Sequence, residues 1–140
     1  MKILVTGSAG HLGEGLVRVL REQHAQRHEV VGVDILQTPF TTHVGSIADR
    51  AFVAGCMKGV DAVIHTATLH KPHVATHSKQ AFVDTNITGT LALLEEAVSQ
   101  NVSRFIFTST TSTFGHALKP APGSPAVWIN EDVVPIPKNI

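Results

Sequence analysis

The stretch TGSAGHLGEG places three glycines in the spacing G-x-x-G-x-x-G, between an apolar run and a segment with helical periodicity. In this context Gly7 permits a tight turn, Gly10 lets the backbone approach a ligand closely, and Gly13 lets the helix pack against the strand. Free N–H groups at the start of the helix, near His11 and Leu12, can bind phosphate groups. A flexible glycine turn is the alternative, but the strand–turn–helix context predicts a dinucleotide site.

An acidic residue, Asp34, ends the next apolar run, HEVVGVD. A carboxylate at the end of the second strand accepts hydrogen bonds from the hydroxyls of an adenosine ribose and repels a 2′-phosphate. The residues that follow, ILQTPF, include no arginine to neutralise such a phosphate. The site is therefore predicted to prefer NAD to NADP. The alternative is that Asp34 is a solvent-exposed aspartate at a strand end and binds no ligand.

Histidines are crowded after the fourth apolar run, at positions 65, 70, 73 and 77. Neutral imidazole is a common metal ligand. However, neither a second cysteine nor a cluster of acids joins these histidines, and Pro72 interrupts the helical register. The pattern favours histidines in a loop near the cofactor, and we predict no metal site.

Strand-like and helix-like segments alternate as far as Gly115. Strands are expected at residues 2–6, 28–34, 41–47, 61–67 and 104–110, and helices from residue 11, within 48–59 and over 78–100. Strands that alternate with helices predict an α/β fold, a parallel sheet with helices on both faces.

Apolar residues recur at helical spacing in both long helices, and such a stripe usually faces the core. On the first helix the stripe is Leu12, Leu16, Val19 and Leu20, and on the long helix it is Val83, Ile87, Leu91, Leu94 and Val98.

The composition changes after Gly115, since five of the 7 prolines lie between Pro120 and Pro137. Proline is excluded from helix interiors and central strands. We therefore predict a dinucleotide-binding domain over residues 1–115 and a proline-rich loop or tail over 116–140. Trp128 is expected to anchor this tail by burial.

The composition is that of a globular protein, with 43% apolar and 16% charged residues. Lys+Arg and Asp+Glu balance at 11 each, so no charge pattern points to nucleic acid or an acidic membrane. No apolar run is long enough to span a bilayer. The single cysteine, Cys56, is expected in the core, and its lack of a disulfide partner suits the cytoplasm.

Five stretches in order, TGSAGHLG, VVGVD, DAVIHTAT, NITGT and FIFTSTTSTFG, resemble landmarks of the extended short-chain dehydrogenase/reductase family. Its members include NAD-dependent sugar-nucleotide epimerases and dehydratases. The resemblance covers Lys2 to about Gly115. It implies a Rossmann-type doubly wound parallel sheet with the strand order 3-2-1-4-5. It also implies NAD as cofactor and chemistry that begins with hydride transfer from a hydroxyl substrate, such as a sugar nucleotide.

The resemblance also implies roles for individual residues. Thr110 matches the catalytic Ser/Thr, whose hydroxyl binds the reacting substrate oxygen. Ser46 stands where many relatives have an aspartate that binds adenine, which leaves a weaker acceptor, and Phe114 replaces a tyrosine ring. The implied cofactor-binding residues are Gly7, Gly10, His11, Leu12, Gly13, Asp34, Ser46, Ile47, Thr66, Ala67, Thr68, His70, Asn86 and Thr108.

The chain contains no tyrosine. Family members use a Tyr-x-x-x-Lys pair after the fifth strand, where the tyrosine transfers the proton and the lysine lowers its pKa. Counting from Thr110 leads to the final residues PIPKNI, which resemble the run-in to that helix. We therefore expect the N-terminal portion of such an enzyme, inactive alone. A non-catalytic dinucleotide-binding module and an inactive truncated fragment are the alternatives, and His116 could act as a substitute base.

In such a portion the fifth strand would be an edge, with unpaired backbone groups and exposed apolar side chains. Edges of this kind tend to be covered, either by another copy of the chain or by a loop that folds back. Self-association through the fifth strand is therefore expected, alongside a dinucleotide and a possible small-molecule substrate as partners.

Overall fold

The computed structural model describes residues 1–24 and 28–137, and the last residues of the predicted tail, Lys138 to Ile140, lie outside this description. The chain divides into two compact units, the first from Met1 to Thr108 and the second from Ser109 onward. In the part of the chain that the structure describes, no helix is both long and apolar enough to cross a membrane.

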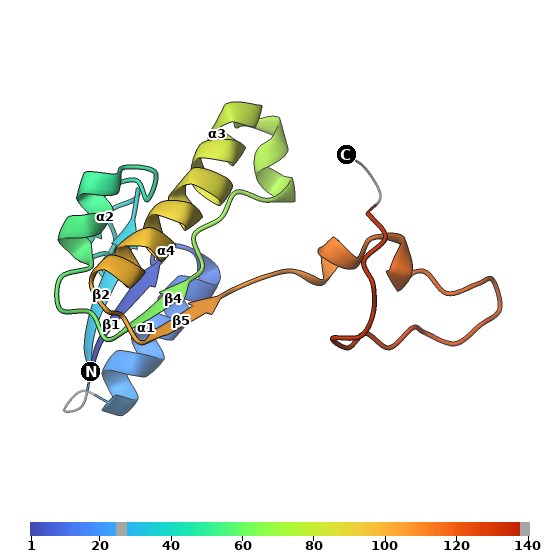
Figure 1. The fold of residues 1–140 in the computed structure, drawn as a ribbon, viewed down its shortest axis with the longest axis horizontal. Helices are drawn as coiled ribbons and strands as arrows, with labels where there is room; N and C mark the ends of the chain where they lie inside the picture. The colour runs from blue at the N-terminus through green and yellow to red at the C-terminus, as the bar shows by residue number, and fades with distance from the viewer. Residues whose placement is uncertain (25–27, 138–140) are drawn as a thin grey trace. The chain divides into compact units, whose positions relative to one another are not determined.

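Five parallel strands form one sheet in the first unit, in the order β3-β2-β1-β4-β5 (Figure 1). This arrangement confirms the predicted fold class. The observed strands are shorter than expected at several ends. The strands are β1 (Lys2–Thr6), β2 (Glu29–Asp34), β3 (His43–Val44), β4 (Ala62–His65) and β5 (Arg104–Phe107).

The two faces of the sheet carry separate apolar cores, because successive side chains of a strand point to opposite faces. Ile3 and Val5 of β1 pack with Val17 of helix α1 (His11–His24). Leu4 packs on the other face in a cluster with Val53 of α2 (Arg50–Cys56), Cys56 and residues of α4 (Thr90–Ser99). The expected burial of Cys56 is confirmed. Helices therefore cover both faces, as a doubly wound sheet requires.

The buried face of α1 differs from the expected one. Val17 is fully buried, whereas Leu12 and Val19 are 48% and 47% exposed, so their assignment to the buried stripe was wrong. Leu16 and Leu20 are partly buried and pack beside Val17. The stripe follows the spacing i, i+1, i+4 from Leu16, and Leu12 instead faces the cavity described below.

The long helix is interrupted. It consists of α3 (Lys79–Val83), the π-helical turn η2 (Asp84–Gly89) and α4. Its predicted apolar stripe is exposed at all of its positions, Val83, Ile87, Leu91, Leu94 and Val98, so the expected burial was wrong. The buried positions are Gly89, Ala92, Leu93 and Ala97. Small residues let the helix approach closely, since a Cβ on Gly89 would lie 2.6 Å from Ile47 Cγ1.

The second unit contains two short 3₁₀ turns, η3 (Thr111–Phe114) and η4 (His116–Leu118), and an isolated parallel bridge between Gly115 and Ile136. The N–H of His116 donates to the Ile136 carbonyl at 2.7 Å, and the Ile136 N–H donates to Phe114 at 3.0 Å. Trp128 is 92% exposed, so its expected burial was wrong.

Candidate functional site

The glycine turn connects β1 to α1 through two close backbone approaches. Gly7 has a φ of +74°, and a Cβ there would lie 2.7 Å from the Ala67 nitrogen. A Cβ on Gly13 would lie 2.0 Å from the Gly7 carbonyl oxygen, so only glycine lets α1 begin this close to the strand. The predicted structural roles of Gly7 and Gly13 are confirmed. His11, Leu12 and Gly13 at the start of α1 line the cavity described below, and the first N–H groups of a helix have no acceptor within it.

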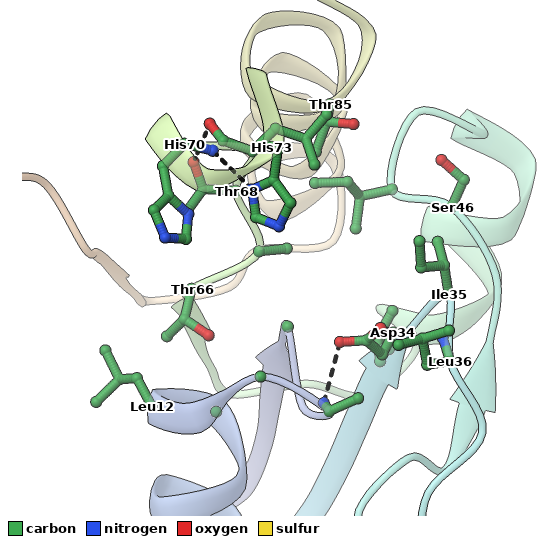
Figure 2. Close-up of a pocket in the computed structure, with 18 of the residues that line it drawn as sticks. Leu12, Asp34, Ile35, Leu36, Ser46, Thr66, Thr68, His70, His73 and Thr85 are labelled. Atoms are coloured by element: carbon green, nitrogen blue, oxygen red, sulfur yellow. Dashed lines mark hydrogen bonds between the residues drawn. The ribbon is translucent and has the colours of Figure 1, made fainter. Parts of the chain in front are cut away.

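Asp34 lies beside this turn, at the carboxyl end of β2. Its Oδ2 accepts a hydrogen bond from the Ala9 N–H at 3.0 Å, and its Oδ1 accepts one from the Leu36 N–H at 3.0 Å (Figure 2). The two bonds fix the orientation of the carboxylate. Each oxygen can accept a further hydrogen bond, because a carboxylate offers about four acceptor positions.

A cavity of about 720 Å³ opens over the turn and Asp34. Its volume lies in the usual range for ligand sites. Among the described residues, the lining contains every predicted cofactor-binding residue except Asn86, namely Gly7, Gly10, His11, Leu12, Gly13, Asp34, Ser46, Ile47, Thr66, Ala67, Thr68, His70 and Thr108.

Leu69, within the stretch Thr66 to His70 expected beside the cofactor, and the loop histidines His73 and His77 also line the cavity. The lining residues that were not predicted are Ala9, Val33, Ile35, Leu36, Gly45 and Thr85. Several of them directly follow strand ends, and in a parallel sheet all of those ends meet at one edge, which is a signal that could have found them. Thr85 had no comparable signal, because the π-helical turn that presents it cannot be read from apolar spacing.

Asn86 organises a loop of the cavity wall instead of forming part of the lining. Its Oδ1 accepts hydrogen bonds from the Leu69 N–H at 2.8 Å and from Thr68 Oγ1 at 3.2 Å. Its Nδ2 donates to the Leu69 carbonyl at 2.8 Å. The side chain thus fixes residues that line the cavity, while Thr85 beside it in the turn faces the cavity itself. Direct contact of Asn86 with the cofactor stays a prediction.

A buried hydroxyl at the end of β1 begins a second network. Thr6 Oγ1 accepts from the Thr66 and Ala67 N–H groups at 3.2 and 3.3 Å. Its own proton is therefore directed to His65 Nδ1, at 2.6 Å. Because Nδ1 accepts, the neutral ring of His65 carries its proton on Nε2.

His65 connects this network to the π-helical turn η2. The Nε2–H donates to Thr90 Oγ1 at 2.9 Å, and Thr90 donates to the Asn86 carbonyl at 2.9 Å. The side chain is 2% exposed, and burial lowers the pKa of His65 to about 4. Both nitrogens already have partners, so His65 stands in the structure as a neutral link and not as a cavity base.

His70, His73 and His77 line the cavity, by contrast, on and beside the 3₁₀ turn η1 (Lys71–Ala75). This placement fits the predicted loop of histidines near the cofactor. Among the residues that the structure describes, no three His, Cys, Asp or Glu side chains are placed to hold a metal ion.

Thr110, the predicted catalytic hydroxyl, belongs to the second unit. Its Oγ1 accepts a hydrogen bond from the Ser112 N–H at 3.2 Å, and its carbonyl accepts from Thr113 Oγ1 at 2.9 Å. The hydroxyl proton of Thr110 has no role in either bond. A catalytic role for Thr110 stays a prediction.

Comparison with known proteins decides the family. The model of the NAD dependent epimerase/dehydratase family matches residues 3–133. This chain belongs to that family. Curated relatives include a UDP-glucose 4-epimerase of Erwinia amylovora, 33% identical over 82% of this chain and 38% of the relative. Another is a 3-beta-hydroxysteroid dehydrogenase of Mycolicibacterium neoaurum, 31% identical over 79% of this chain and 32% of the relative.

The fold has close counterparts among solved structures. A short-chain dehydrogenase/reductase superfamily protein from Agrobacterium tumefaciens with bound NAD superposes with a TM-score of 0.82 and 30% identity. The match covers 99% of this chain and 40% of that protein. The chain therefore spans well under half the length of these family members.

The buried His65 makes stability depend on pH. Its folded pKa of about 4 lies below the ordinary 6.5, so the unfolded chain binds the proton first as pH falls. The contribution of His65 is complete above pH 6.5 and is lost between 6.5 and about 4, by up to about 3 kcal/mol. We therefore expect the free energy of unfolding, measured in urea, to decrease less between pH 6.5 and pH 4 in His65→Gln than in the wild type.

The matched control is His43→Gln, because His43 is an exposed histidine on β3. In this variant the free energy of unfolding should depend on pH as it does in the wild type. Equal slopes for His65→Gln and the wild type would show that His65 is not held neutral by the fold.

Proposed function

We propose that this chain binds NAD and forms the cofactor site of an NAD-dependent epimerase/dehydratase-type oxidoreductase. The observation that carries the proposal is the Asp34 carboxylate, fixed by the Ala9 N–H of the glycine turn at the edge of a cavity large enough for a nucleotide. The NAD bound to a structure with the same fold supports the same cofactor here. A sugar nucleotide, or a related hydroxyl compound, is the proposed substrate of the longer protein, as the named epimerases among the relatives suggest.

Each group of the chain has a distinct part in this function. NAD supplies the hydride-accepting ring when bound. The N–H groups at the start of α1 hold its phosphates, and Asp34 accepts from the adenosine ribose hydroxyls. Thr110 is proposed to bind the reacting oxygen of the substrate through its hydroxyl. No tyrosine is present to take the proton, so the chain performs binding and positioning without the acid–base step.

The second candidate is a dinucleotide-binding module that never catalyses, or an inactive fragment. The absence of tyrosine from the 140 residues favours it. The first candidate and the non-catalytic module both require NAD binding, whereas an inactive fragment does not. We also propose a cytoplasmic location, in keeping with the lone buried Cys56.

The edge of the sheet at β5 supports self-association. In the described part of the chain β5 pairs only with β4, which leaves one side of its backbone open. Ile106 and Phe107 on this strand are 57% and 55% exposed. An open edge with apolar side chains is a surface on which a second copy can pair. We propose association through this strand.

Cofactor preference is the first prediction. NAD should bind about tenfold or more tightly than NADP, because Asp34 would repel the 2′-phosphate. Asp34→Ala should weaken NAD binding and narrow the ratio, measured by titration calorimetry with both cofactors. Asp61→Ala removes an exposed carboxylate at the opposite, amino end of the sheet and should leave the ratio unchanged. Equal or tighter NADP binding by the wild type would refute the preference.

Catalysis is the second prediction. The 140-residue protein should bind NAD yet show no turnover of sugar nucleotides or simple alcohols in an NADH absorbance assay, because acid–base catalysis worth about 10²–10⁴-fold is absent. Adding a separately expressed piece of a relative that begins at its Tyr-x-x-x-Lys helix should restore activity. Thr110→Ala should then lower the restored turnover. Turnover by the chain alone would contradict the proposal and would indicate that His116 acts as a substitute base.

Association is the third prediction. Light scattering at tens of micromolar protein should show a mass above that of the monomer, and Ile106→Lys should reduce it because a charge on an edge strand opposes pairing. Val98→Lys is the matched control, since Val98 is a still more exposed apolar residue, on α4. A monomeric wild type, or dissociation by Val98→Lys alone, would show that β5 is not the contact.

A further inference from the structure

Two buried hydroxyl groups lie next to the site without lining its cavity. Ser8 of the glycine turn is 0% exposed, and Thr41, in the loop between β2 and β3, is 7% exposed. Neither residue belongs to the cavity lining. A buried hydroxyl needs hydrogen-bond partners. The partners of these two groups lead to Asp34.

The hydroxyl of Thr41 is used to its full capacity. Its Oγ1 lies 2.9 Å from the carbonyl oxygen of Leu36, which can only accept, so Thr41 donates its single proton there. Thr41 must then accept from Ser8 Oγ at 3.2 Å and from Thr38 Oγ1 at 3.0 Å. One donor and two acceptor positions are all that a hydroxyl offers. Every bond of Thr41 therefore has a defined direction.

These bonds close a ring around the carboxylate of Asp34. Leu36, whose carbonyl accepts from Thr41, donates its N–H to Asp34 Oδ1 at 3.0 Å. Ala9, which follows Ser8, donates its N–H to Asp34 Oδ2 at 3.0 Å. We call this closed set of hydrogen bonds the Asp34 ring; its members are Ser8, Ala9, Asp34, Leu36 and Thr41. Figure 2 shows Asp34 and Leu36 on the side of the ring that faces the cavity, with the bond from the glycine turn.

We propose that Thr41 is a positioning residue that fixes the Asp34 carboxylate and thereby sets the preference of the site for NAD over NADP. Thr41 acts through Leu36 and the glycine turn, and it touches no ligand in the cavity. The inference rests on the proposed NAD site and adds to it a residue that controls the choice between the two cofactors.

The packing of the loop against β2 holds Thr41 in place. A Cβ on Gly32 would lie 1.9 Å from the Phe40 carbonyl oxygen and 2.9 Å from Ser8 Cβ, so glycine lets the loop return to the turn. The N–H of Thr42 then donates to the Gly32 carbonyl at 2.7 Å. The Asp34 ring is therefore formed before a ligand arrives, and less entropy is lost on binding.

Discrimination against a 2′-phosphate depends on the direction of the Asp34 carboxylate. Among the described residues of the lining, neither lysine nor arginine is present to attract such a phosphate. Two arginines touch the loop outside the lining, Arg18 over the Phe40 ring at 4.4 Å and Arg21 at the Pro39 carbonyl at 3.2 Å. A carboxylate held by two N–H groups cannot turn away from a 2′-phosphate, whereas one held by a single N–H can. Loss of the ring thus weakens both the attraction for NAD and the repulsion of NADP.

The test is calorimetric titration of the protein with NAD and with NADP, with circular dichroism to confirm folding. Thr41→Val keeps the shape of the side chain and removes its hydroxyl. We expect the Kd of NAD to rise about threefold and that of NADP to stay constant, so that the ratio of the two falls about threefold. Thr41→Ser keeps the hydroxyl and should keep the wild-type ratio.

The matched control is Thr42→Val. Thr42 is the neighbouring threonine, and its Oγ1 accepts from the Gly32 N–H at 3.1 Å outside the Asp34 ring. This variant also loses one hydrogen bond to β2, and it should keep the wild-type ratio. Ser8→Ala opens the ring at its other hydroxyl and should lower the ratio in the same direction as Thr41→Val, which keeps the proposal testable if Thr41→Val does not fold.

A double-mutant cycle shows whether Thr41 acts through Asp34. In an Asp34→Ala background, Thr41→Val should change the Kd of NAD by less than about 1.5-fold, because the group that it positions is absent. The same threefold change in this background as in the wild type would show a general effect on the fold and would overturn the proposal.

The remaining outcomes separate this inference from the proposed function. A wild-type protein that prefers NAD, together with unchanged ratios in Thr41→Val and Ser8→Ala, overturns the role of Thr41 and leaves the NAD site standing. An equal fall of the ratio in Thr42→Val overturns it too, because the effect would not belong to the ring. Absence of NAD binding by the wild type refutes the proposed function and this inference together.

Discussion

The contact between Gly13 and the carbonyl of Gly7 is the constraint on which the rest of the site depends. It brings the first turn of α1 against the end of β1, at a distance that no other residue allows. The same turn places the Ala9 N–H where it binds Asp34, so the backbone proposed to bind phosphate and the carboxylate proposed to bind ribose are oriented by one loop. The close packing at Gly13 therefore positions both the glycine turn and Asp34, which lie far apart in the sequence.

The opposite wall of the cavity is tied to the same strand end through side chains. Thr6 binds His65, His65 binds Thr90, and Thr90 binds the carbonyl of Asn86, whose amide holds the loop at Leu69. Every link is a hydrogen bond with a defined donor, which requires a neutral His65. Burial provides that state by lowering the pKa of the ring. Both walls of the cavity are thus attached to the carboxyl end of β1.

The parallel sheet and the glycine turn could be predicted because they follow from local patterns: apolar runs, glycine spacing and an acid at a strand end. The strand order came from the resemblance to a known family. The buried faces of the helices could not be predicted. Val17, and not Val19, faces the core, and α4 packs through Ala92, Leu93 and Ala97 while Leu91, Leu94 and Val98 stay exposed. Apolar spacing measures hydrophobicity, whereas close approach to a sheet selects small side chains. The burial of His65 was hidden for a related reason, since only the folded chain supplies its two hydroxyl partners.

The cavity and its lining are formed within a single unit of the chain. The groups that line the cavity all lie in the unit that ends at Thr108, and they are positioned by strand ends and turns of that unit alone. Recognition of a dinucleotide needs N–H groups, a carboxylate and a cavity, all of which the sheet provides. Proton transfer needs a group with a tuned pKa beside the substrate, and a threonine hydroxyl such as that of Thr110 ionises too weakly to replace it. The residues proposed to bind the cofactor are therefore all positioned within this unit, independently of any group that would transfer a proton.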